Sequence, residues 1–249
     1  MAISLARPQR ARHGDNPEPR SGSTRARGDN AHMTHVARLS LATGSVLMLA
    51  TGFVDAYTFL QHGHVFAQAM TGNLVLIAIG AFDPTIVAFW RPLVQYVAFV
   101  SGVAVLWGWT RRRGTPAPQL ATLALQVVVL VVVGFLPAGG LSVVITAAIA
   151  FAAGMQIAAF RDVGRAAFTT TVMTTDSMKT VNAALTALSS ADPEDRAVAR
   201  AYGTALVGFV AGAFLGAFLT TRMGEQAAWV DAALFAVAAG LYVAERRDA

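Results

Sequence analysis

Apolar residues run along this 249-residue chain in long stretches that few charged residues interrupt. A helix needs about 20 mostly apolar residues to cross a hydrocarbon core about 30 Å thick. Six stretches have this length and composition: 41–60, 86–109, 119–136, 141–160, 200–221 and 226–244. The pattern therefore predicts an all-α, polytopic membrane helix bundle.

Two further stretches, 65–82 and 167–188, are helix-like but unusually polar. The first contains Gln68, Thr71 and Asn73, and the second contains a run of threonines with Asp176 and Lys179. We expect them to be re-entrant or buried helices beside six spans; eight full spans are the alternative.

The arginines distinguish these two topologies. The basic clusters are five, namely the tail with Arg38, then 111–113, 161 with 165, 196 with 200, and 246 with 247. Six spans place all five clusters on one side, which the positive-inside rule makes cytoplasmic. Eight spans would place 111–113 opposite both termini, so we favour six spans with both termini in the cytoplasm.

Composition narrows the function classes. Hydrophobic residues make up 55% of the chain and charged residues 13%, which is typical of a membrane protein. Most of the net charge of +5 comes from residues 1–38, which we expect to form a disordered basic tail ahead of a membrane domain at 39–247. We therefore expect no nucleic acid partner. The chain has no cysteine, which excludes disulfides and thiolate metal sites.

The two halves of the membrane domain resemble each other. Residues 52–56 and 70–73 match 154–158 and 173–176, and residues 99–102 match 209–212 in the same order. We interpret this as a duplication with repeats at 41–136 and 141–244. Three spans in each half would make the repeats inverted, and four would make them parallel.

The stretch from Gly52 to Asn73, GFVDAYTFLQHGHVFAQAMTGN, resembles the signature of the YoaK family of bacterial multi-pass membrane proteins. The resemblance covers about 38–247. It implies a multi-pass protein of the bacterial cytoplasmic membrane, with no agreed substrate or reaction. In the second half Gln156 matches the family's Gly-x-Gln element, whereas Thr175 replaces an expected glycine.

Asp55 is the main candidate for chemistry, because an ionised carboxylate inside a span costs about 2.5–3.5 kcal/mol and must face protein or water. It could bind a proton or cation, or it could be a structural acid bonded to a neighbouring helix. His62 and His64 follow at the end of this span and are weaker candidates for a proton relay. The alternative is that both histidines are interfacial loop residues.

Further candidates for a substrate or ion site come from the two polar segments. Thr71, Gly72 and Asn73 combine a hydroxyl, a permissive glycine and an amide, which suits either a broken helix that binds a ligand or interhelical packing. The second segment and its repeat partner contribute Gln156, Thr174, Asp176 and Lys179, and the last two are spaced to form an ion pair. The alternative for this segment is an amphipathic helix at the surface.

Other residues have structural interpretations. Gly208, Gly212 and Gly216 recur every four residues and predict a smooth stripe for close helix packing. Asp231 begins the last apolar stretch, so we interpret it as interfacial.

These patterns predict a secondary transporter or permease for a small solute, and the alternative is a non-transporting scaffold or regulatory protein. The sequence has no phosphate-binding glycine loop, zinc-protease motif or nucleophile elbow, so we expect no enzyme, no catalytic residue, no metal and no cofactor. The expected partners are the lipid bilayer and an unknown small solute, and a homo-oligomer is compatible with the sequence.

Because the chain lacks cysteine, single-cysteine labelling tests the topology directly. We predict that Arg112→Cys and a cysteine added at the C-terminus react with an impermeant reagent from the same face of the membrane. Labelling from opposite faces would contradict six spans.

Overall fold

The computed structural model describes residues 40–113, 118–137, 139–160, 173–189 and 192–247, with the backbone only at 173–176. The predicted tail at 1–38, and the arginines at 161 and 165, lie outside these ranges. The described helices belong to one compact unit, 36–249.

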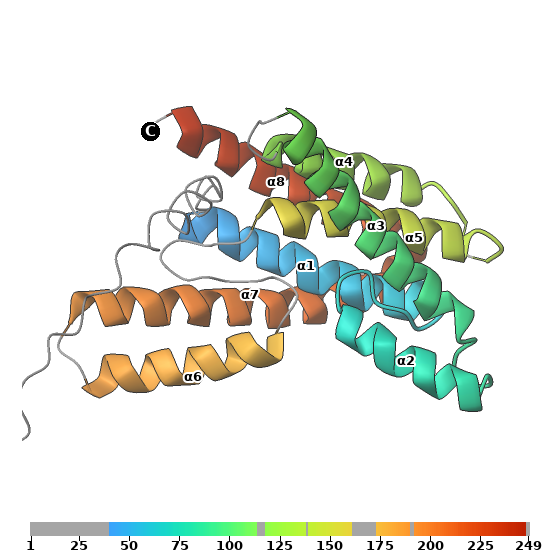
Figure 1. Cartoon of the computed structure of the whole chain (residues 1–249), viewed down its shortest axis with the longest axis horizontal. Helices are drawn as coiled ribbons and strands as arrows, with labels where there is room; N and C mark the ends of the chain where they lie inside the picture. The colour runs from blue at the N-terminus through green and yellow to red at the C-terminus, as the bar shows by residue number, and fades with distance from the viewer. Residues whose placement is uncertain (1–39, 114–117, 138, 161–172, 190–191, 248–249) are drawn as a thin grey trace, which may run out of the picture. The chain divides into compact units, whose positions relative to one another are not determined.

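Every regular element in these ranges is helical (Figure 1). The helices are α1 (Leu41–Gln61), α2 (Met70–Phe82), α3 (Trp90–Arg113), α4 (Gln119–Val133), α5 (Ser142–Ala159), α6 (Met173–Ser189), α7 (Pro193–Met223) and α8 (Ala227–Arg247), and the short 3-10 helix η2 (Gly224–Gln226) joins α7 to α8.

Four helical segments of the described chain are long and apolar enough to cross a membrane. These are α1, α3, α5 and the continuous stretch Pro193–Arg247, which contains both α7 and α8. Two shorter apolar helices, α2 and α4, have 13 and 15 residues. The chain is therefore an all-α membrane protein, as the apolar pattern predicted.

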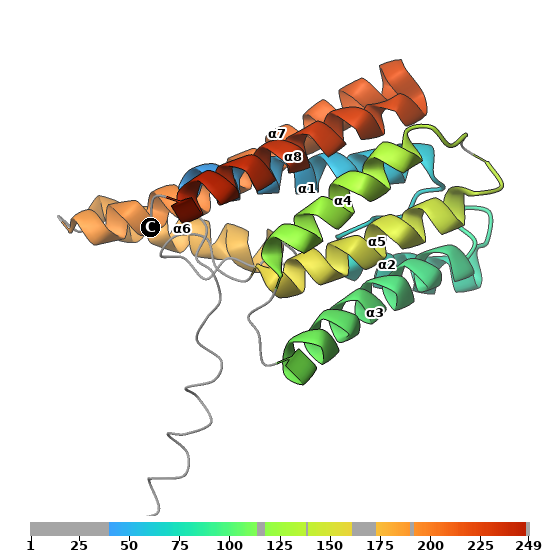
Figure 2. The same cartoon turned by 90° about the horizontal axis from the view of Figure 1, so that it is seen from above.

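Two helix pairs dominate the packing. α1 packs mainly along α7 and α3 along α5, while α8 lies against both α4 and α1 (Figures 1 and 2). The two outer helices have fewer neighbours, because α2 packs against α3 and α6 against α7. The largest fully buried side chains include Tyr57, Phe53 and Phe235, from α1 and α8.

Glycines allow the two main pairs to approach backbone to backbone. A Cβ on Gly52 of α1 would lie 2.0 Å from the Phe209 carbonyl oxygen of α7, and one on Gly212 of α7 would lie 1.9 Å from the Leu49 carbonyl oxygen. In the second pair, a Cβ on Gly154 of α5 would lie 2.2 Å from the Phe99 carbonyl oxygen of α3. Any side chain at these positions would force the helices apart.

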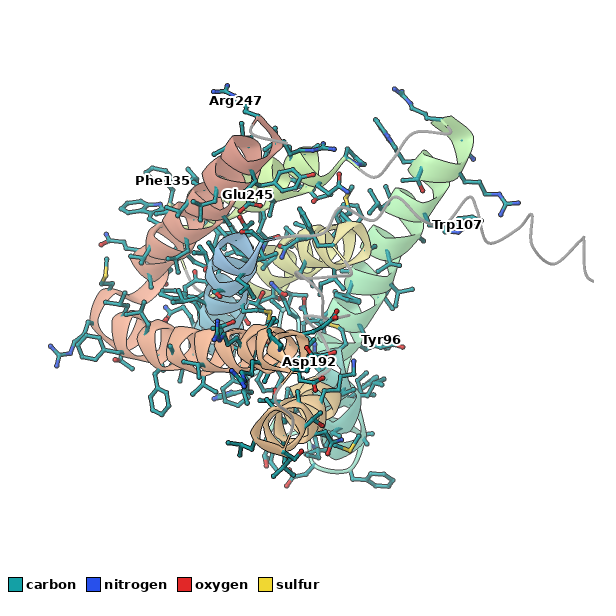
Figure 3. The ribbon with its side chains drawn as sticks, turned by 90° about the vertical axis from the view of Figure 1, so that its left-hand side faces the viewer. Tyr96, Trp107, Phe135, Asp192, Glu245 and Arg247 are labelled. Carbon is teal, nitrogen blue, oxygen red and sulfur yellow. The ribbon has the colours of Figure 1, made fainter. Side chains whose placement is uncertain are left out.

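At one end of the unit, α1 and α8 are tied together by hydrogen bonds. The Ser40 hydroxyl accepts a 3.2 Å hydrogen bond from the Thr43 amide and so caps α1. The hydroxyls of Ser40 and Thr43 donate to the carboxylate of Glu245 near the end of α8. Figure 3 looks onto this end, where Glu245 and Arg247 are labelled.

Helix boundaries differ from the predicted segments mainly at α2 and α7. α2 begins at Met70 rather than at 65, because the chain turns at Gly63 (φ 87°) and His64 (φ 61°) and runs without helix to Ala69. α7 begins at Pro193 rather than at 200, because the side chain of Asp192 accepts from the Glu194 amide and starts the helix early.

The close approach of α1 and α7 predicts a specific sensitivity to a single methyl group. Gly212→Ala should destabilise the protein by about 1–3 kcal/mol, because its Cβ would collide with the α1 backbone. Gly108→Ala on α3 is the matched control, since no atom lies within 4 Å of its added Cβ. Thermal unfolding in detergent micelles measures both, and equal effects of the two variants would contradict the packing.

Candidate functional site

Asp55 sets the geometry of the candidate site. The residue is buried on α1, with 5% of its surface exposed. One carboxyl oxygen accepts hydrogen bonds from the Gln68 amide at 2.7 Å and from the Ala69 amide at 3.4 Å. These amides immediately precede Met70, the first residue of α2. The carboxylate therefore lies at a helix N-terminus, where the exposed amides and the helix dipole favour negative charge.

This contact also fixes where α2 begins in depth. Asp55 precedes the end of α1, Gln61, by six residues, which correspond to about 9 Å along a helix. The loop after α1 thus folds back along α1, and α2 begins beside its interior turns (Figure 1).

Asn73 closes the same loop. Its amide nitrogen donates to the Phe66 carbonyl at 2.7 Å, and its amide oxygen accepts from the Phe66 backbone nitrogen at 3.0 Å. Asn73 is fully buried, and Gly72 lies against the Phe66 ring, 2.9 Å from where a Cβ would be. Thr71 is exposed on the outer side of α2, so the structure brings Asn73, but not Thr71, into the interior.

His62 is buried in a chain of hydrogen bonds. Its Nε2 lies 3.0 Å from the Tyr57 hydroxyl and its Nδ1 lies 3.5 Å from the Ser142 hydroxyl of α5. The Tyr57 hydroxyl donates to the Glu225 carbonyl oxygen at 3.4 Å, and the Ser142 oxygen accepts from the Gly139 amide at 3.1 Å. The interior of the unit is therefore connected to the exposed loop at Gly139.

His64 has a different environment. It is exposed, and its ring packs edge-on against Phe59 at 5.2 Å between centroids. Of the two histidines singled out in the sequence, only His62 belongs to the interior network.

Several buried polar groups have no hydrogen-bond partner among the described residues. Both oxygens of Asp231 are in this state although Asp231 is fully buried, and so are the whole side-chain amides of Gln68, Gln126 and Gln156. Gln95 differs, since its nitrogen donates to the Thr146 hydroxyl at 2.5 Å and only its oxygen is unpartnered. Buried polar atoms are satisfied in nearly all proteins, so each of these requires an explanation.

Asp231 corrects the sequence interpretation, which placed it at the membrane interface. Ala228, Asp231, Ala232 and Phe235 are all buried and follow the helical spacing of a single face of α8. This face packs against α1 and α4, so it takes the carboxylate into the interior. The spacing was visible in the sequence, but nearness to a span end was given more weight.

Hydrogen bonds fix how α1 and α8 lie along each other, because Thr43 bonds to Glu245 at one end and the Tyr57 hydroxyl bonds to the Glu225 carbonyl at the other. The two packed helices are therefore antiparallel, and Asp55 and Asp231 lie at a similar depth on them. We call Asp55, Tyr57, His62, Gln68 and Asp231 the polar cluster. It lies where α1 ends and α8 begins, away from the end that carries Glu245 and Arg247.

The second polar segment forms α6. Lys179 is half-buried there, with its ammonium nitrogen 5.8 Å from the centroid of the Tyr202 ring on α7. This distance allows a cation–π interaction. The side chains of Thr174 and Asp176 lie outside the described part, so the predicted pair of Asp176 with Lys179 stays a prediction.

The glycine stripe of α7 faces α1. A Cβ on Gly208 would lie 3.0 Å from the Ser45 carbonyl oxygen, and one on Gly216 would lie 2.6 Å from that of Phe53, on either side of the Gly212 contact. The stripe thus lies in the helix interface and outside the polar cluster. Within the described residues, no three histidine, aspartate or glutamate side chains are grouped to hold a metal ion.

The fold and the polar cluster define a helical membrane protein with acidic and amide groups buried inside it. The chain belongs to the family described as "Protein of unknown function (DUF1275)", whose model matches residues 43–241. It is similar to the UPF0700 transmembrane protein YoaK of Bacillus subtilis (strain 168), with 29% identity over 140 residues. That alignment covers 52% of this chain and 60% of the relative, so the chain matches less than two thirds of the relative's length.

No solved structure matches this chain. The resemblance to the YoaK family noted in the sequence is confirmed, and with it the membrane location.

Proposed function

We propose that this protein is a secondary transporter or permease for a small solute, with the polar cluster at its functional site. The observation that carries the proposal is the set of fully buried polar side chains that have no hydrogen-bond partner in the described part of the chain, above all both oxygens of Asp231. An unpaired buried amide costs about 1–3 kcal/mol and a buried charge more. A protein retains such groups in a membrane when they serve a ligand, an ion or a proton.

The broken path of the chain between α1 and α2 supports this function. Transporters place binding sites where a helix starts or stops inside the membrane, because its free amides and carbonyls can then bind charged groups. Here the two backbone amides just before α2 donate to Asp55, beside the side-chain amide of Gln68, which has no partner in the described chain. Opening that contact would expose both donors and acceptors to a solute.

The arrangement of the helices favours six crossings with α2 and α6 as partial helices. In Figures 1 and 2 the end of α3 with Arg111–Arg113, the start of α7 with Arg196 and Arg200, and the end of α8 lie toward the same end of the unit. In this topology the positive-inside rule puts that end, and both termini, in the cytoplasm. We propose that this membrane is the bacterial cytoplasmic membrane, which the resemblance to the YoaK family also implies.

Contacts between the halves support two inverted repeats. The sequence match pairs Gly52 with Gly154 and Phe99 with Phe209, and each glycine packs on the phenylalanine carbonyl of the other half. Gly102 and Gly212 are also matched. A Cβ on Gly102 would lie 2.1 Å from the Phe151 carbonyl oxygen, and one on Gly212 would lie 1.9 Å from that of Leu49. A pseudo-twofold axis between the halves would produce this reciprocal exchange.

One observation favours the alternative of a non-transporting scaffold. Asp55 and Asn73 both bond to the backbone of the loop before α2, and such bonds can simply lock the loop. In a scaffold, however, the unpartnered oxygens of Asp231 would have no function. The two roles are therefore separated by measuring transport.

We predict that purified protein in proteoliposomes carries at least one member of a panel of small solutes, and that Asp55→Asn lowers the initial rate about tenfold or more. The substitution removes the charge at nearly constant shape. Asp83→Asn is the matched control, because Asp83 is an exposed residue in the turn after α2 and should leave the rate unchanged. Equal flux with and without protein for every solute would leave the scaffold as the better account.

A further inference from the structure

We infer that Asp55 and Asp231 form a single proton-binding site, in which two buried carboxyl groups share one exchangeable proton. This inference rests on the proposed transport function only in naming the proton as the coupling ion. The site itself is argued from the described residues.

The two acids differ in what they can bind. One oxygen of Asp55 accepts hydrogen bonds from two backbone amides, and these bonds stabilise the charged form of the carboxyl group. Asp231 is 0% exposed and neither of its oxygens has a partner in the described chain. An isolated carboxylate in an apolar interior is neutralised by taking up a proton rather than remaining charged. Asp231 is thus the group that takes up the proton, and the nearby negative charge of Asp55 favours this uptake.

Within the described ranges, neither acid is hydrogen-bonded to a cationic side chain that could offset two negative charges. The polar groups beside the pair are Tyr57 and His62 of the first helix and its cap, and the turn at Glu225 of η2, which is itself acidic. α4, which packs against the same face of α8, contains no charged residue, and Arg222 at the end of α7 is exposed over the Phe218 ring. Arg91 of α3 lies against Gly63 in the loop.

A chain of proton-carrying groups lies beside this pair. The hydroxyls of Ser142 and Tyr57 flank the two nitrogens of His62, and Tyr57 lies two residues after Asp55 on α1. An imidazole can accept a proton on one nitrogen and release another from the opposite nitrogen, and a hydroxyl can do the same through its oxygen. Each transfer breaks one O–H or N–H bond and forms another. We place the last transfer between the Tyr57 hydroxyl and the pair, once that hydroxyl turns away from the Glu225 carbonyl, so one proton is added to the pair and its charge changes from −2 to −1. Such a chain conducts protons but not metal ions.

The proposed topology gives this route a direction. The loop at Gly139, the turn at Glu225 and His62 all lie at helix ends opposite those with the arginine clusters 111–113, 196 with 200, and 246 with 247. The end with His62 carries the single arginines 91 and 222. Under the positive-inside rule this is the extracytoplasmic side, from which a cell's proton gradient drives protons inward. Loading of the pair from this side would suit a solute–proton symporter.

Infrared difference spectroscopy of the purified full-length protein tests the site without any solute. The C=O band of a protonated carboxyl group disappears when the group ionises. We expect the wild type to keep such a band at pH values above the range in which ordinary aspartates ionise, and we call it the late band. In Asp55→Asn and in Asp231→Asn the remaining acid should bind its proton at least about tenfold more weakly than the wild-type pair does, since the neighbouring like charge is gone. The band should be absent in the double variant.

Asp83→Asn controls for exposed acids. Hydrogen bonds from the Thr85 hydroxyl and backbone amide hold the pKa of Asp83 below its usual range, so this acid contributes nothing to the late band. The Asp83→Asn spectrum should match the wild type.

Three results would overturn the inference. They are a wild type without a late carboxylic acid band, single variants that titrate at the wild-type midpoint, and a band that Na⁺ removes at constant pH, which would show a metal cation site instead. The first result needs no variant and decides the matter even if the aspartate variants fail to fold. If the late band titrates as expected but no solute crosses in proteoliposomes, the transport function is rejected and the proton site stands. If a solute crosses and the wild type has no late band, the proton site is rejected.

Discussion

A carboxylate buried in a membrane protein must obtain hydrogen-bond donors, a cation or a proton, and this requirement organises the structure around Asp55. The donors come from the amides of Gln68 and Ala69, and only a chain that folds back along α1 can deliver them. The break before α2, the pairing of Asn73 with the Phe66 backbone and the buried position of the Gln68 amide all follow from that one contact.

The remainder of the unit surrounds this contact with closely packed helices. Glycines at the α1–α7 and α3–α5 interfaces bring backbones together, so the helices fit without bulky side chains between them. Close packing of small residues contributes van der Waals energy where lipid offers no hydrophobic driving force between helices. This rigidity makes the unpartnered oxygens of Asp231 more telling, because the surrounding helices cannot easily shift to satisfy them.

The sequence predicted the helical class, the family and most helix ends, because membrane length requirements and turn residues act locally. Asp83–Pro84 and Pro137–Gly140, for example, lie between the predicted helices, and Asp83, Pro84 and Pro137 lie between helices in the structure as well. It also singled out Asp55, Asn73 and His62, since polar residues inside apolar stretches are costly wherever they lie.

What the sequence missed depends on contacts between distant segments. Nothing local reveals that Asn73 bonds to the Phe66 backbone or that the amides of Gln68 and Ala69 bond to Asp55. Asp231 was assigned to the interface by its place near a span end, whereas its helical face carries it inside against α1 and α4. Gln68 and Tyr57 gained importance only when their neighbours were known.

The central claim is that Asp55 and Asp231 act on each other inside the protein. A double-mutant cycle on thermal stability, with Asp55→Asn, Asp231→Asn and both together, measures this interaction at a pH where the pair is fully ionised. Because each single change relieves the same repulsion, the two effects should fail to add by about 1 kcal/mol or more. Effects that add to within about 0.5 kcal/mol would show that the two acids are independent and would contradict the account.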